Sequence, residues 1–180
     1  MDGSAPGCRV LGLCGSLRRA SINRALLHAA AIVMPDPTRF TVHEDLGSLP
    51  LFNADLVVAP DSPVAELWRS VTTADAIVIA SPEYAHGITG VLKNALDWLV
   101  GLPEFYGKQV AVLNASARAS HADAALREVL STMGARLVEE ASITLPLTGV
   151  PADSAAILAD PHRRAALNSA MAALARGAGT

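Results

Sequence analysis

Residues 9–23, RVLGLCGSLRRASIN, join an apolar run to a turn of small and basic residues and then to the start of a helical pattern. The run RVLGLC has no polar alternation, which is typical of a strand that is buried on both faces. The helical pattern extends over residues 21–34. The stretch therefore predicts a strand, a loop and a helix, in that order.

The same succession recurs along the chain. Runs such as AIVIA (76–80) and VAVLN (110–114) have the length of buried strands, and patterns of 10–15 residues with helical spacing separate them. This alternation is the signature of a doubly wound parallel sheet, so we expect an α/β, flavodoxin-like single domain over residues 1–180, with its core at 8–145. The expected strands are 9–14, 40–43, 76–80, 110–114 and 136–143, in the order 2-1-3-4-5; the expected helices are 21–34, 64–73, 90–100, 122–133 and 161–176.

Composition narrows the class of protein. The chain has 180 residues, 51% of them apolar, and a formal net charge of −3. That charge favours neither nucleic acid nor an anionic membrane as a partner. No apolar run approaches the roughly 20 residues that span a bilayer. The N-terminus lacks the pattern of a signal peptide, and no Cys or His lies at metal-ligand spacing. We expect a cytoplasmic protein without a metal site.

In the expected sheet, ligands bind beyond the carboxyl ends of strands 1 and 3, where the winding direction reverses. Loops 15–21, 81–89 and 115–120 lie at that edge, so a functional site is expected there.

The first loop has the chemistry of an anion site. It contributes hydroxyls from Ser16 and Ser21, the Arg18 guanidinium and the Asn23 amide at a helix N-terminus, where free N–H groups favour a phosphate. No acidic residue occurs between Gly3 and Pro35. The spacing matches neither the dinucleotide fingerprint nor a P-loop. The alternative is that Ser21 is only an N-cap and the arginines form a solvated turn.

Strand 76–80 runs into SPEYAHGITG (81–90) and VLKNALDW (91–98). Together with the first loop, this segment resembles the NADPH-dependent FMN reductase family, whose hallmarks are G-S-x-R-x-x-S-x-N and P-E-Y…G-x-L-K-N-A-x-D-W. The resemblance covers roughly residues 8–145. It implies FMN as cofactor and NADPH or NADH as hydride donor.

The resemblance also implies site residues. The phosphate of FMN would lie on Ser16, Arg18, Ser21 and Asn23, and the flavin ring beside Pro82, Glu83 and Tyr84. Two positions depart from the family, which often has Asn where this chain has Ala85 and Pro where it has Thr89. Glu83 and Tyr84 also fit an exposed turn without a ligand.

The third loop, NASARASH (114–121), matches the family at Ser116 but has alanines where the family has glycines. Alanine resists positive φ, so the path of the backbone there is expected to differ. Arg118 either faces the flavin or a phosphate of the donor, or it is a solvated residue near the next helix.

The expected function is an NAD(P)H-dependent FMN reductase, or a related oxidoreductase that reduces a flavin, a quinone or another small acceptor by a ping-pong scheme. FMN carries the hydride, so no catalytic acid or base is assigned and His86 is treated as incidental. The alternatives are a non-catalytic electron carrier and a flavin-free relative. Trp98 and Leu99 on helix 90–100, beside the apolar loop 46–58, predict a homodimer or homotetramer.

Overall fold

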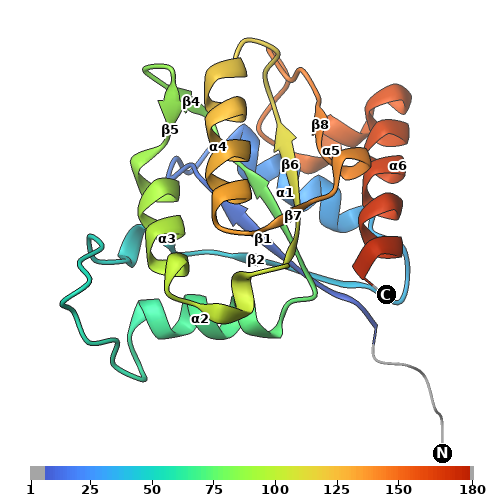
Figure 1. Ribbon diagram of the computed structural model, residues 1–180. Coiled ribbons are helices and arrows are strands. Elements are labelled where there is room, and N and C mark those ends of the chain that lie inside the picture. The colour runs from blue at the N-terminus through green and yellow to red at the C-terminus, as the bar shows by residue number, and fades with distance from the viewer. Residues whose placement is uncertain (1–6, 179–180) are drawn as a thin grey trace, which may run out of the picture.

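The computed structural model describes residues 7–178 and shows a central sheet with helices on both faces (Figure 1). The sheet is parallel, in the order β2-β1-β3-β6-β7, with β8 also paired to β6. This confirms the flavodoxin-like α/β fold and the order 2-1-3-4-5. The N-terminus, where no signal peptide was expected, falls largely outside the described residues. The strands are β1 (Arg9–Cys14), β2 (Arg39–His43), β3 (Ala76–Ala80), β6 (Gln109–Asn114), β7 (Arg136–Leu137) and β8 (Ile143–Thr144).

Both faces of the sheet are buried, which explains the uninterrupted apolar runs. In β3, Val78 packs with the helices of one face, whereas Ile77 and Ile79 pack with those of the other. The first face carries α1 (Ile22–Ile32), the short α5 (Ser154–Leu158) and α6 (Pro161–Ala178). The second carries α2 (Pro63–Thr73), α3 (Gly90–Val100) and α4 (Ser120–Thr132). No helix among residues 7–178 is long and apolar enough to cross a membrane.

The prediction of one continuous strand over residues 136–143 is wrong. A 3-10 turn at Glu139–Ala141 separates two short strands there, β7 and β8. The N–H of Val138 donates to the carbonyl of Val110 (2.9 Å) before the turn. After it, the hydroxyl of Ser142 accepts from the N–H of Val112 (3.1 Å). The Ser142 side chain thus provides the hydrogen-bond acceptor for a backbone N–H of β6 at the point where the neighbouring backbone turns away.

The expected apolar surface on helix 90–100 is also wrong at Trp98 and Leu99, which are 4% and 0% exposed. The irregular segment that follows the 3-10 helix Leu46–Ser48 covers this part of α3. Asn94 accepts from the N–H of Phe52 (2.8 Å) and donates to the carbonyl of Pro50 (3.0 Å). The exposed apolar surface lies instead on the loop, where Leu51 is 83% and Val57 is 93% exposed.

Candidate functional site

The three loops meet at the carboxyl edge of the sheet, as the strand order requires. The N–H of Gly15, which begins the first loop, donates to the carbonyl of Ala80 (2.9 Å) at the end of β3. A Cβ at residue 15 would collide with the side chain of Ser81 and lie 3.0 Å from the hydroxyl of Thr89. Glycine is needed here because the first and second loops touch.

A cavity of about 340 Å³ lies between these loops. This volume is within the range of small-molecule and cofactor sites. The cavity brings together five of the predicted residues, and it leaves four others off its wall. The five are Asn23, Pro82, Glu83, Ser116 and Arg118; the four are Ser16, Arg18, Ser21 and Tyr84.

The start of helix α1 carries unpaired positive charge. Ser16 and Ser21 are buried, and the hydroxyl of Ser21 accepts from the N–H of Arg24 (3.3 Å), so Ser21 is indeed an N-cap. Arg18 and Arg19 are exposed and form no ion pair with any residue of the described range 7–178. The first turn of α1 holds no acidic side chain. An anion at this end of the helix would meet both the arginines and the helix dipole.

Asn23 is the most informative residue of the first loop. It borders the cavity and is only 4% exposed, yet its Oδ1 atom is buried without a hydrogen-bond partner among residues 7–178. A buried acceptor without a donor is costly, which points to a donor from a ligand or water. The ribityl hydroxyls of FMN are donors of this kind. The residues present therefore fit a ligand that combines hydroxyl groups with a phosphate.

The second loop is a hairpin rather than an irregular segment, with β4 (Glu83–Tyr84) antiparallel to β5 (Gly87–Ile88). Ala85 and His86 form its two-residue turn with φ of 49° and 60°. The carboxylate of Glu83 reaches α4, where Oε2 accepts from the N–H of Ala122 (2.8 Å). Tyr84 is 55% exposed and is not among the residues that line the cavity.

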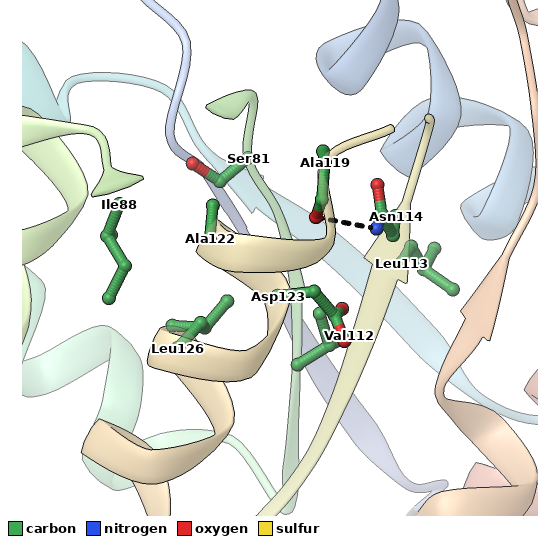
Figure 2. A pocket seen from close by; sticks show the side chains of 9 residues that line it. All are labelled: Ser81, Ile88, Val112, Leu113, Asn114, Ala119, Ala122, Asp123 and Leu126. Atoms are coloured by element: carbon green, nitrogen blue, oxygen red, sulfur yellow. Dashed lines mark hydrogen bonds between the residues drawn. The ribbon is translucent and has the colours of Figure 1, made fainter. Parts of the chain in front are cut away.

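The third loop is organised by Asn114, which is 7% exposed at the end of β6. Its Oδ1 accepts from the N–H of Ser116 (3.0 Å), and its Nδ2 donates to the carbonyl of Ala119 (3.2 Å), the bond drawn in Figure 2. The hydroxyl of Ser116 then accepts from the N–H of Arg118 (3.2 Å). Residues 115–120 all keep negative φ, so the alanines in this loop are compatible with its backbone.

Sequence reasoning missed several residues that border the cavity, among them Ser81, Asn114, Leu147 and Thr148. A polar residue at the carboxyl end of a buried strand is a recognisable signal: Ser81 directly follows β3, and Asn114 is the last residue of β6. Leu147 and Thr148 follow β8 in a segment without a periodic pattern. Their place in the cavity depends on how β8 pairs with β6.

Comparison with known proteins gives a consistent picture. Residues 8–148 match the family model described as NADPH-dependent FMN reductase. An NAD(P)H-dependent FMN reductase of Pseudomonas aeruginosa is 42% identical over 112 residues, which are 61% of this chain and 60% of that protein. An NAD(P)H:quinone oxidoreductase of Solanum tuberosum is also 42% identical over 112 residues, 60% of this chain and 58% of the relative. The matched part thus spans about three fifths of these relatives.

Solved structures extend the likeness over nearly the whole chain. The flavoenzyme FerB of Paracoccus denitrificans, an NAD(P)H:(acceptor) oxidoreductase, superposes with a TM-score of 0.77 at 26% identity, covering 96% of this chain and 97% of that one. The apo form of the NADH:FMN oxidoreductase EMOB has the same fold, with a TM-score of 0.69 at 24% identity over 94% of this chain and 89% of its own. With its two loop motifs and its strand order, the chain belongs to the NADPH-dependent FMN reductase family.

Proposed function

We propose that this protein is an oxidoreductase that binds FMN in the cavity between the three loops and passes hydride from NADPH or NADH to a flavin, a quinone or another small acceptor. The observation that carries the proposal is the orphaned, buried Oδ1 of Asn23 on the wall of a 340 Å³ cavity. The loop before helix α1 contains Arg18 and Arg19, both exposed and without an ion pair among residues 7–178. When bound, FMN supplies the ring that accepts and releases hydride. The reductase names of the relatives support turnover over a passive electron carrier.

The first loop is proposed to hold the phosphate. Ser16, Ser21 and Asn23 surround the start of α1 at exposures of 4–5%, and Arg18 lies outside them in solvent. The free N–H groups of the first helical turn favour an anion, and a guanidinium pairs with phosphate through two parallel hydrogen bonds. Arg18 can close over a ligand because nothing in the described chain pairs with it.

The second and third loops are proposed to flank the flavin ring. Pro82 and Glu83 border the cavity on one side, and Ser116 and Arg118 border it on the other. Tyr84, exposed on the hairpin, would lie at the rim and influence entry of substrates. None of these residues is needed as a proton donor, since hydride moves between the donor, the flavin and the acceptor.

The test is direct. Purified protein is titrated with FMN while its absorbance near 450 nm is recorded, and NADPH oxidation is then followed with a quinone as acceptor. We expect bound FMN, bleaching by NADPH, and parallel double-reciprocal lines when donor and quinone are varied, because both would use the same exposed face of the ring. Absence of FMN binding would overturn the proposal. Intersecting lines would overturn only the shared face.

We further propose that the chain forms a homo-oligomer, a dimer or tetramer, through the loop that covers α3. Leu51, Leu56 and Val57 are 83%, 47% and 93% exposed on this one segment. Apolar side chains gathered on an ordered loop are typical of a protein contact, and a second copy of the chain is the partner proposed.

A further inference from the structure

The hairpin of β4 and β5 is attached to the first turn of helix α4 by two side-chain contacts. Oε2 of Glu83 accepts from the N–H of Ala122 at 2.8 Å. The ring of His86 stacks on that of His121, with centroids 4.3 Å apart and planes 7° from parallel. Figure 1 shows the hairpin beside the end of α4 at which the helix begins. These residues are 35–39 positions apart in sequence, so the contacts tie the second loop to the element that follows the third.

Helix α4 depends on this contact for its cap. Helices α1, α2 and α3 each begin at a Ser or Thr whose own hydroxyl accepts from the helix backbone: Ser21, Ser62 and Thr89. At the start of α4 stands Ala119, which has no such group. The N–H of Ala122 is one of the donors that a helix start leaves without an intrahelical partner. A carboxylate is the most favourable acceptor there, because it also faces the positive end of the helix dipole.

The hairpin turn needs to be held. Ala85 and His86 have φ of 49° and 60°, the pattern of a type I′ turn, which normally contains Asn and Gly. Side chains with a Cβ are strained at positive φ, and such strain persists where the surrounding structure imposes it. A void of about 10 Å³ is lined by Ile88 of β5 and by Ala122 and Leu126 of α4, together with residues of β6 (Figure 2). Ile88 of the hairpin also packs against the apolar cluster that contains Leu126 of α4, so the hydrogen bond and the ring stack add to an apolar contact.

We propose that Glu83 is a positioning residue: it acts through helix α4, and sets the separation between the two walls of the cavity, instead of contacting the ligand with its charge. Its own loop forms one wall with Pro82, and the segment leading into α4 forms the other with Ser116 and Ala119. The inference rests on the proposed function, because the spacing matters only if the cavity takes a flavin ring.

A series of substitutions at Glu83 separates the effect of side-chain length from the effect of its charge. Glu83→Gln keeps an acceptor oxygen at the same distance but removes the charge, whereas Glu83→Asp keeps the charge on a side chain one methylene shorter. We expect Glu83→Asp and Glu83→Ala to weaken both FMN and riboflavin binding about tenfold or more, and Glu83→Gln to stay within about threefold of the wild type. Equal effects on the two flavins are expected because the hairpin faces the ring end. The matched control is Glu128→Ala, which removes a carboxylate from the exposed side of the same helix.

A second measurement needs no flavin. Amide hydrogen exchange of residues 83–90 and of Ala122 should accelerate in Glu83→Ala and Glu83→Asp, but not in Glu83→Gln. Ala85→Gly, which removes the Cβ at φ 49°, should restore part of the flavin affinity in the Glu83→Ala background, by about threefold or more.

The outcomes distinguish the two proposals. Failure of the wild type to bind FMN overturns the proposed function itself. Normal FMN binding by the wild type with equally tight binding by Glu83→Ala overturns the positioning role alone. Weak flavin binding by Glu83→Gln together with normal binding by Glu83→Asp would show that the charge acts on the ligand directly. That result would also overturn the positioning role.

Discussion

The indole N–H of Trp98 donates to the carbonyl oxygen of Pro50 at 2.8 Å, across 48 positions of sequence. The ring of Phe52 stands edge-on to the same indole, with centroids 5.0 Å apart. Asn94, one helical turn before Trp98, bonds to the backbone on both sides of Leu51. Two residues of the K-N-A-x-D-W segment therefore hold a loop in place and do not reach the cavity.

Replacing Asn94 by Ala should loosen this loop. The N–H of Phe52 loses its acceptor, and the carbonyl of Pro50 keeps only the indole, so the free energy of unfolding should fall by about 0.5–1.5 kcal/mol per lost bond. Limited proteolysis should cut residues 50–58 faster than in the wild type. Lys93→Ala is the control, since it removes only a surface ion pair with Asp97. Unchanged proteolysis in Asn94→Ala would show that the loop is held by other contacts.

Arg18→Ala should weaken FMN binding about 10- to 150-fold, the equivalent of about 1.5–3 kcal/mol for a charge-assisted hydrogen bond. Riboflavin lacks the phosphate, so wild type and variant should bind it almost equally in the same fluorescence titration. Arg39→Ala, at the opposite end of the sheet, provides a control for loss of positive charge. If Arg18→Ala binds FMN as tightly as the wild type, the phosphate lies elsewhere.

The mass in solution should be a multiple of 18.6 kDa when measured by light scattering at micromolar concentration. Lysine in place of Val57 or Leu51 should lower it, because a charge would be buried in the contact. Ala124→Lys adds the same charge at an exposed position of α4 and should leave the mass unchanged. A wild-type mass near 18.6 kDa would rule out the oligomer.

His86→Ala and Tyr84→Phe should keep most of the NAD(P)H oxidation rate. Removing a general acid or base typically costs about 10²–10⁴-fold, and neither residue is assigned that role. The His86 ring stacks on His121, and Tyr84 is more than half exposed, so their loss should change affinity for substrates more than kcat. Steady-state kinetics with FMN present distinguish an effect on substrate affinity from an effect on kcat. A hundredfold loss of kcat in His86→Ala would identify it as a catalytic residue.

Stability should fall with decreasing pH because of His43, at the end of β2. Burial lowers the pKa of this imidazole below its usual value of 6.5, against the opposing effect of Glu66, Asp45 and Glu44. At pH values below 6.5, this histidine binds a proton in the unfolded chain, whereas burial opposes protonation in the folded chain. The free energy of unfolding therefore decreases as the pH falls below 6.5. In urea unfolding between about pH 7.5 and about pH 5.5, His43→Asn should lose less stability than the wild type. The exposed His28→Asn should show the wild-type slope, and an identical slope in His43→Asn would contradict the assignment.

The sequence by itself determined the elements of the fold and the edge at which the site lies. The apolar runs of β1, β3 and β6 are local signals, because a strand buried on both faces needs an apolar residue at nearly every position. Right-handed crossovers and the reversal after strand 1 then place loops 15–21, 81–89 and 115–120 at one edge. The capping role of Ser21 was likewise open to prediction, since it depends on residues three positions apart.

Only the tertiary structure decided where individual side chains point. Glu83 bonds to a helix 39 positions away, and Trp98 bonds to a loop 48 positions away. Neither partner is specified by the local sequence, so the bond from Glu83 to α4 and the bond from Trp98 to the covering loop were not predicted. The break of the last strand at 139–141 depends in the same way on a hydroxyl, that of Ser142, meeting a backbone N–H of β6. Local patterns specify which elements form, because backbone hydrogen bonds and burial act over a few residues; which polar groups meet is settled only when those elements pack.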